Sequence, residues 1–167
     1  QEKGRMFEER NSALYYKFVG SDVDHLSESK DEQETISLGL KWIGYKNQFF
    51  SSALIPDGKF NGALIRSGMN NDPAYLKNFH TETTVDYNPA DNNGPGFRFY
   101  LGPNLYPLLH SYDKGVDDDK ALDLDKLVPL GFKFFRWINT WIIIPIFTFL
   151  GKYIANYGII ILLMTII

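Results

Sequence analysis

The last ten residues of the chain, 158–167, contain no charged side chain and a single polar one, Thr165. An apolar run exposed to water promotes association, so its surroundings limit what the chain can fold into. A spanning helix needs about 20 apolar residues, whereas a run of 10–14 is typical of a core helix or a membrane-adjacent segment. The sequence ends within this run and begins at Gln1 without a signal-peptide pattern. We therefore expect an internal part of a larger membrane protein. The alternative is a complete protein whose last helix packs into its own core.

Charge divides the chain into two parts of different character. The net charge is −3, but residues 132–167 hold three basic residues, Lys133, Arg136 and Lys152, and no acidic one. Residues 1–131 hold the other 14 basic residues and all 20 acidic ones, for a net charge of −6. A basic, apolar part beside an acidic one is typical of a domain held at an anionic membrane surface. It argues against a nucleic-acid binder, and the absence of cysteine excludes disulfides and thiolate metal sites.

The first part of the chain is predicted to be β-structure. Leu14, Tyr16 and Phe18 alternate with Tyr15 and Lys17, which is the period of two that a half-buried strand shows. Strands of this kind are predicted at residues 12–19, 35–40, 49–55, 59–65, 81–87 and 96–101. Stretches rich in Pro, Gly, Asn and Asp separate several of them, at residues 56–58, 70–73 and 88–95. Many short strands joined by turns favour an antiparallel β-sandwich.

Two acidic stretches, residues 22–34 and 113–125, are predicted to be solvated loops. The second contains three consecutive aspartates, 117–119, as a candidate calcium site. That run lacks the spaced ligands and the glycine of a calcium-binding loop, so we do not predict calcium binding there. Helical patterning is scarce in this part, apart from a short turn at residues 103–109.

Residues 130–152 change to the period of a helix. An apolar stripe recurs at spacings of three and four residues, through Phe135, Ile138, Ile142, Ile146 and Phe149. The opposite side carries Lys133, Arg136, Thr140 and Thr148, interrupted by Ile144 and Phe147. A helix with a basic face and an aromatic and aliphatic face suits the interface of a bilayer. A helix that caps the sandwich would bury the same stripe without lipid.

Neighbouring residues favour the membrane over the capping helix. Trp137, Trp141 and Tyr153 are side chains that concentrate at headgroup depth. The run after Asn156 is apolar on every face, which a capping helix does not require. Pro145 lacks a backbone donor and clashes with the carbonyl of Trp141, so we expect a kink or a break there.

Short motifs in the chain resemble the YidC branch of the YidC/Oxa family of membrane protein insertases. The matching segments are FYLGPNLYPLL at 99–109, LVPLGF at 127–132, WIIIPIF at 141–147, and residues 151–167 with Asn156, Tyr157 and Gly158 opening the apolar run. Residues 42–43, 48–50 and 55–56 are similar to a stretch of the family's large extracytoplasmic domain. No single match is specific, but together they follow the family's order over residues 40–167.

The resemblance implies a more specific fold class than the strand pattern predicts. The implied fold is mainly β and consists of an incomplete antiparallel β-sandwich of the galactose-mutarotase-like supersandwich type. An amphipathic helix and a truncated transmembrane helix follow it. The implied segments are residues 1–128 for the periplasmic domain, 129–153 for the interface helix and 156–167 for the start of the transmembrane helix. The implied interface residues are Lys133, Phe135, Arg136, Ile138, Trp141, Ile142, Pro145, Ile146 and Phe149; Asn156, Tyr157 and Gly158 begin the span.

The function implied by the resemblance is to help newly made proteins insert and fold in the bacterial inner membrane. In the family, a hydrated groove with a basic residue receives the polar segment of an incoming protein and so lowers the cost of polar groups in hydrocarbon. That basic residue is expected just beyond Ile167, and Lys152 precedes the span and does not replace it. The implied partners are the lipid bilayer and nascent membrane proteins, with the secretion translocon as a further candidate. No cofactor, metal ion or nucleic acid is implied.

A carbohydrate-active or carbohydrate-binding role is the alternative, because mutarotase-type folds also carry sugar-processing enzymes that need a positioned acid and base. His80 and Glu82 would share one face of a strand and could meet there. Such a pair is usually an ordinary surface contact, and the sequence has no nucleophile elbow, phosphate loop or metal-ligand cluster. We therefore expect no enzymatic activity. A periplasmic scaffold module contacting the translocon is compatible with the insertase interpretation.

Overall fold

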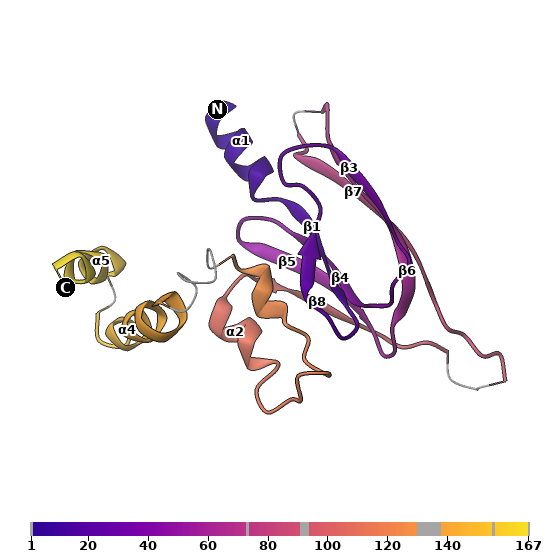
Figure 1. Ribbon diagram of the computed structural model, residues 1–167. Helices are drawn as coiled ribbons and strands as arrows, with labels where there is room; N and C mark the ends of the chain where they lie inside the picture. The colour runs from indigo at the N-terminus through magenta and orange to yellow at the C-terminus, as the bar shows by residue number, and fades with distance from the viewer. Residues whose placement is uncertain (1, 73, 91–93, 130–137, 155, 167) are drawn as a thin grey trace. The chain divides into compact units, whose positions relative to one another are not determined.

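The computed structural model describes residues 2–72, 74–90, 94–129, 138–154 and 156–166. The chain divides into two compact units, Gln1–Val128 (unit 1) and Pro129–Ile167 (unit 2), and each is described by itself. Unit 1 is mainly antiparallel β-sheet with a few short helices, and the described part of unit 2 is helical (Figure 1).

The elements follow one another in this order. In unit 1, helix α1 (Glu2–Arg10) precedes β1 (Ala13–Phe18), β2 (Val23–His25), β3 (Glu32–Ile36), β4 (Leu40–Lys46), β5 (Phe50–Pro56), β6 (Phe60–Met69), β7 (Lys77–Val85) and β8 (Phe97–Pro103). Helix α2 (Tyr106–Ser111) and the 3₁₀-helix η1 (Leu124–Leu127) come next. Unit 2 contains the π-helical turn η2 (Asn139–Ile143), α4 (Ile144–Gly151) and α5 (Tyr157–Ile166).

The strands of unit 1 form two connected sets. One follows the order β2-β1-β4-β5-β8, and in the other β6 pairs with both β3 and β7. Every pairing is antiparallel, and the sets join where Leu40 of β4 pairs with Phe60 of β6. Figure 1 shows β3, β6 and β7 as a layer beside the strands of the first set. This arrangement fits an antiparallel β-sandwich.

A separate apolar core lies on each side of β1 and β4. The first contains Ala13, Tyr15, Trp42, Ala53, Ile55 and Tyr100 of the sheet, packed with Leu109 of α2 and Leu124 and Leu127 of η1. The second contains Leu14, Tyr16, Leu40 and Ile43, packed with Leu26, Ile36, Phe60, Ala63 and Ile65. Strand β1 is therefore buried on both faces, and its prediction as a half-buried strand is wrong. Its Tyr15 and Lys17 side is covered by other residues of the chain and does not face water.

The predicted strands at residues 12–19, 49–55, 59–65, 81–87 and 96–101 overlap β1, β5, β6, β7 and β8. The one at residues 35–40 has the wrong bounds, because it joins the last two residues of β3 to the first residue of β4 across residues 37–39. Beyond Leu40, no prediction covers β4, which pairs with β1 and β5. Gly44 allows the close packing of this strand, since a Cβ there would lie 3.2 Å from the ring of Trp42 and 3.3 Å from the carbonyl oxygen of Ser52.

Both acidic stretches contain regular structure, so the prediction of solvated loops is wrong in part. Residues 22–34 include β2 and the start of β3, where Glu34 accepts a 2.8 Å hydrogen bond from the hydroxyl of Tyr16. Residues 113–125 end in η1, with Asp125 buried. The turn expected at residues 103–109 continues into helix α2. The partner of Glu34 lies on β1, outside its own stretch, so the local sequence gives no sign of it.

Helix α1 has no counterpart in the sequence prediction, because its polar residues surround it without an apolar stripe. Contacts elsewhere in unit 1 hold it. The guanidinium of Arg5 donates to the carbonyls of Asn70 and Tyr75, at 3.1 and 3.0 Å, and Glu9 pairs with Arg5 at 2.8 Å.

Candidate membrane-interface site

The predicted interface helix is described from Ile138 onward. Lys133, Phe135 and Arg136, three of its predicted residues, lie outside the described residues. The remainder forms η2 and then α4, and Ile138 leads into η2 with helical backbone angles. The described part is thus helical on both sides of Pro145.

Pro145 explains a change of helix type in this segment. Proline offers no N–H for an α-helical hydrogen bond, and its ring crowds the carbonyl of Trp141 four residues earlier. The π-helical turn η2 uses longer-range hydrogen bonds, and α4 begins immediately after it with the proline in its first turn. At the position of the predicted kink or break, the structure has a transition from π-helix to α-helix between Ile143 and Ile144.

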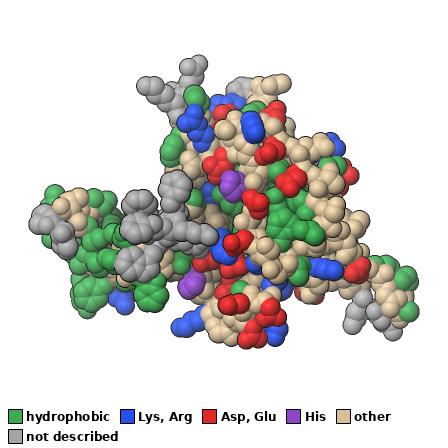
Figure 2. All heavy atoms as spheres, in the orientation of Figure 1, with side chains coloured by type: hydrophobic (Ala, Val, Ile, Leu, Met, Phe, Trp, Pro, Cys, Tyr) green, Lys and Arg blue, Asp and Glu red, His purple; other side chains and the backbone are tan. Residues whose placement is uncertain are grey.

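Unit 2 exposes apolar side chains over much of its described surface. They are Trp141, Ile142, Phe149, Tyr153, Tyr157, Ile159, Ile161, Leu162 and Leu163, with Trp141 at 72% exposed. Ile138 and Ile146 are half-buried, and Ile160 is buried. Figure 2 shows hydrophobic side chains gathered over α4 and α5. An apolar surface of this kind marks contact with lipid or with another protein.

The polar side chains on α4 and α5 are compatible with apolar surroundings. The hydroxyl of Thr148 donates to the carbonyl of Ile144 at 2.8 Å, and that of Thr165 donates to Leu162 at 2.7 Å. A threonine that bonds to the preceding turn does not need water. Within the part of the chain that the structure describes, no helix is both long and apolar enough to cross a membrane.

The residues predicted to open the transmembrane run form the start of α5. The side-chain oxygen of Asn156 accepts a hydrogen bond from the N–H of Gly158 at 2.9 Å, and its carbonyl accepts one from Ile159 at 3.2 Å. Asparagine is among the strongest N-terminal caps of helices. A Cβ at Gly158 would lie 3.1 Å from the capping oxygen, so glycine leaves room for the cap. Tyr157 begins the helix and is exposed.

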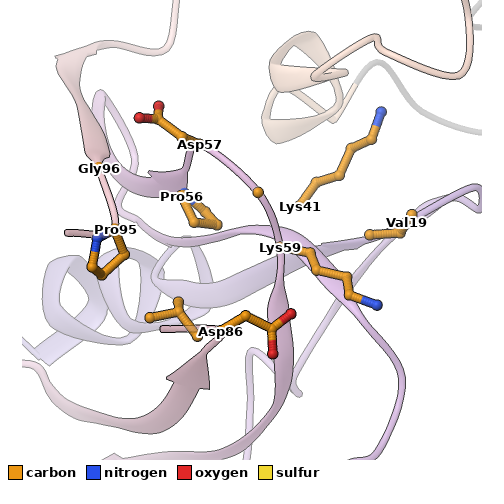
Figure 3. Close-up of a pocket in the computed structure, with 10 residues that line it drawn as sticks. Val19, Lys41, Pro56, Asp57, Lys59, Asp86, Pro95 and Gly96 are labelled. Atoms are coloured by element: carbon orange, nitrogen blue, oxygen red, sulfur yellow. The ribbon is translucent and has the colours of Figure 1, made fainter. Parts of the chain in front are cut away.

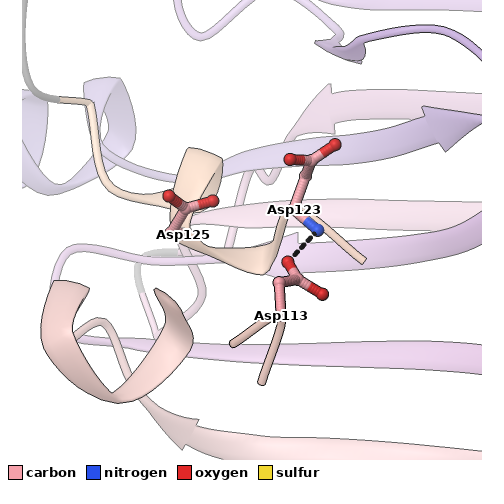
Figure 4. Close-up of side chains that lie close together, drawn as sticks. All are labelled: Asp113, Asp123 and Asp125. Atoms are coloured by element: carbon pink, nitrogen blue, oxygen red, sulfur yellow. Dashed lines mark hydrogen bonds between the residues drawn. The ribbon is translucent and has the colours of Figure 1, made fainter. Parts of the chain in front are cut away.

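Three carboxylates cluster where the segment after α2 lies on the sheet. Oxygen atoms of Asp113, Asp123 and Asp125 lie within 4.8 Å of one another (Figure 4). Asp113 accepts hydrogen bonds from the backbone N–H groups of Leu122 and Asp123, both at 2.6 Å. Because protein groups already bind these carboxylates, the cluster needs no metal ion to explain it.

Lysine side chains supply the positive charge of this cluster. The ammonium of Lys17, on β1, lies 2.6 Å from the carboxylate of Asp123, and Lys126 lies 3.4 Å from it. Burial raises the pKa of the Asp123 carboxyl, but the hydrogen bond and charge of Lys17 outweigh burial and bring that pKa below its ordinary value. Lys126 also pairs with Asp22, and although burial lowers the pKa of Lys126, its acidic partners raise that pKa on balance.

Two donors from β4 fix the same segment. The indole N–H of Trp42 donates to the carbonyl of Leu122 at 2.6 Å, and the ammonium of Lys41 donates to the carbonyls of Ala121, at 3.1 Å, and Asp119. Sequence reasoning missed this network because its donors and acceptors lie far apart in the chain. Its local signal is Asp123, whose φ of 52° is a left-handed conformation that aspartate tolerates better than most residues.

His80 and Glu82, the pair considered for an enzymatic role, lie in contact on one face of a strand, as predicted. His80 Nε2 lies 2.8 Å from Glu82 Oε1 on β7, and the side chains are 56% and 63% exposed. The hydrogen bond and charge of His80 hold the pKa of the Glu82 carboxyl below its usual value. The pair is an ordinary contact on a strand surface, where both side chains are more than half exposed.

A hollow of about 510 Å³ lies beside the β5–β6 turn, bordered by Lys41, Lys59, Asp57 and Asp86 (Figure 3). Its carboxylates already have partners: Asp86 accepts a 2.7 Å hydrogen bond from Asn61, and Asp57 lies 3.6 Å from Arg98. Neither a histidine nor a hydroxyl nucleophile belongs to its lining. This hollow therefore does not favour acid–base chemistry.

Comparison with known proteins identifies relatives of the whole chain. The family profile described as YidC periplasmic domain matches residues 4–148. The chain is 50% identical to the membrane protein insertase YidC of Parabacteroides distasonis, over 100% of this chain and 26% of that protein. It is 47% identical to the YidC of Azobacteroides pseudotrichonymphae, over 100% of this chain and 28% of that protein. For the Porphyromonas gingivalis YidC, identity is 42% over 99% of this chain and 27% of that protein. The chain thus spans about a quarter of the length of these curated relatives, and no solved structure matches it.

Proposed function

The chain belongs to the YidC family of membrane protein insertases, and on this premise we propose that it helps newly made proteins to insert and fold in the bacterial inner membrane. Its contribution is a periplasmic β domain, residues 1–128, joined to a segment that lies at the membrane. The exposed apolar surface of unit 2 carries this proposal, because residues 129–167 combine it with basic residues and no acidic one.

We assign residues 1–128 to a sandwich of the galactose-mutarotase type. Two antiparallel sets of strands with a shared core support the assignment. Among the described strands, β7 pairs with β6 alone and β8 with β5 alone, so each has an edge at which a larger sandwich adds strands. Phe99 and Leu101 of β8 are exposed, as expected of a face that such strands cover.

Residues 129–153 act as the interface helix in this proposal. Ile138, Trp141, Ile142, Ile146 and Phe149 would enter the boundary between headgroups and acyl chains, and Pro145 sets the change of helix type between them. Lys133 and Arg136 would lie at the level of anionic headgroups, where basic side chains gain about 1 kcal/mol each.

Residues 156–167 are the start of a transmembrane helix in this proposal, with Asn156 as its cap and Tyr157 and Gly158 as its first turn. The partners are the lipid bilayer and nascent membrane proteins, and the secretion translocon is a further expected partner. The basic groove residue of the family is assigned to no residue of this chain. Neither His80 nor Glu82 receives a catalytic role.

A pair of substitutions tests the interface helix. Ile142→Asp places a charge among exposed apolar residues and should weaken binding to vesicles by at least about tenfold, because it removes an aliphatic side chain that the bilayer would bury. Thr140→Asp is two positions away, on nearly the opposite side of the helix, and should weaken binding much less. Vesicle flotation measures both. Equal losses from the two variants would contradict an interfacial helix in this orientation.

A further inference from the structure

Two turns at one end of the sheet of unit 1 lack charged side chains. Residues 47–56, which contain the β4–β5 turn and β5, and residues 99–109, which contain the β8–α2 turn, include no Asp, Glu, Lys or Arg. The other residues of 1–131 hold 14 basic and 20 acidic side chains. In the antiparallel pairing of β5 with β8, Phe50 lies opposite Pro103, so the two turns lie at the same end of these strands.

Hydrogen bonds through Asn104 lock the two turns together. Its backbone N–H donates to the carbonyl of Phe49 at 2.7 Å, and its side-chain amide donates to the carbonyl of Asn47 at 2.8 Å. Ser51 donates to its side-chain oxygen at 2.6 Å. Asn47 also fixes its own turn, because its side-chain oxygen accepts the N–H groups of Phe49 and Phe50 at 3.0 and 2.7 Å. Hydrogen bonds within and between the two turns therefore fix the backbone of both.

This fixed backbone presents large apolar side chains to its surroundings. Phe49 is 65% exposed, and Phe50 and Leu105 are more than half exposed. We call Phe49, Phe50 and Leu105 the apolar tip. None of the three belongs to either core of unit 1. Asn47 and Asn104, which fix the two turns, are neutral amides, and Glu8 of α1 borders a hollow beside Phe49 and Phe50.

We propose that the apolar tip inserts into the headgroup region of the same bilayer that binds unit 2. A lipid surface fits it because exposed aromatic and aliphatic side chains are favoured at that depth, and the residues of both turns are uncharged. The chain continues from unit 1 into the interface segment, so the tether keeps the tip at a high effective concentration near the membrane. This inference rests on the proposed function, because it requires unit 2 to bind the bilayer.

Labelling of single introduced cysteines tests whether the apolar tip enters the membrane. The method suits this chain because its sequence contains no cysteine. Phe49→Cys and Leu105→Cys carry an environment-sensitive fluorophore at the tip. Lys59→Cys is the control, since it is exposed in the turn after the other end of β5. Phe149→Cys reports on binding by unit 2. Each labelled chain is reconstituted with vesicles of neutral and anionic phospholipid. Its fluorescence emission is compared with that of the same chain in buffer without lipid or detergent.

The expected result is a blue shift and a gain in emission for both tip labels and for the unit 2 label, with no change at residue 59. A unit 2 label that responds while both tip labels stay in water would overturn the tip and leave the proposed function standing. No response at any position would overturn the proposed function and the tip together. A tip label that responds only when another membrane protein is added would also overturn the proposal, since it would identify a protein partner.

Substitutions give a second readout. Phe49→Asp should weaken vesicle binding of the whole chain about tenfold. Leu38→Asp is the matched control, because Leu38 is also 65% exposed but lies outside the two uncharged stretches, and it should leave binding unchanged. Equal effects from the tip variant and the control would overturn the proposal. Circular dichroism of each variant establishes that the β-structure is retained.

Discussion

Trp42→Ala is expected to destabilise unit 1 by about 4 kcal/mol, within the range for truncating a fully buried tryptophan. Trp42 is 0% exposed and belongs to the core between the sheet and the α2–η1 segment. Its loss removes apolar packing against Leu109, Leu124 and Leu127, and it also leaves the carbonyl of Leu122 without its indole donor. Urea denaturation of the chain in mild detergent, followed by circular dichroism, measures the change in unfolding free energy.

Trp42→Phe separates the two contributions. Phenylalanine keeps much of the packing but cannot donate to Leu122, so the loss should fall to about 1–3 kcal/mol. Leu38→Ala, at an exposed position, should change little. If Trp42→Ala were no more costly than Leu38→Ala, the α2–η1 segment would not depend on this core.

Asp123→Asn is expected to destabilise unit 1 by about 3 kcal/mol, because a buried charge would lose its partner. The Lys17 side chain is 5% exposed and, among the described residues, would keep the carbonyl of Ser21, 2.7 Å away, and gain a neutral amide in place of the carboxylate. Asparagine tolerates the left-handed φ of 52° at this position, so the loss would come from charge and not from backbone strain. Hydrogen exchange of residues 113–128 should increase together with the loss of stability.

Lys17→Met should be milder, at about 1 kcal/mol, because it removes the deeply buried charge itself. The Asp123 side chain is 25% exposed and retains Lys126. The double variant should resemble Lys17→Met alone. Glu82→Gln is the control for an exposed pair and should give no measurable change. A larger loss for Lys17→Met than for Asp123→Asn would contradict this account of the network.

How far the sequence predicted the fold depended on whether each element showed a local pattern. Strands β5 to β8 overlap stretches that were predicted as strands of alternating pattern, separated by turns rich in Pro, Gly, Asn and Asp. Strand β4 was not, because Trp42 and Ile43 face different cores and Gly44 interrupts the run, so no alternation of apolar and polar residues remains. Helix α1 gave no signal because distant carbonyls hold it, through Arg5.

In the candidate site too, features that depend on neighbouring residues could be predicted, and features that depend on distant residues could not. The apolar character of α4 and α5 and the opening of α5 at Asn156 could be predicted, since both depend on neighbouring residues. The pairing of Lys17 with Asp123 could not, because it joins β1 to a segment more than a hundred residues later. Pro145 predicted where the helix would be disturbed. It did not predict that the disturbance would be a π-helical turn and not a kink or a break.

We expect the segment after Val128 to hold the β domain at the membrane. Flotation with vesicles of neutral and anionic phospholipid tests it most directly, by comparing the whole chain with a version ending at Leu127. The whole chain should float with the vesicles, and the shorter version should stay in the dense fraction, because the apolar tip alone buries too few side chains for stable binding. Flotation of the shorter version to the same extent, or failure of the whole chain to float, would contradict the account.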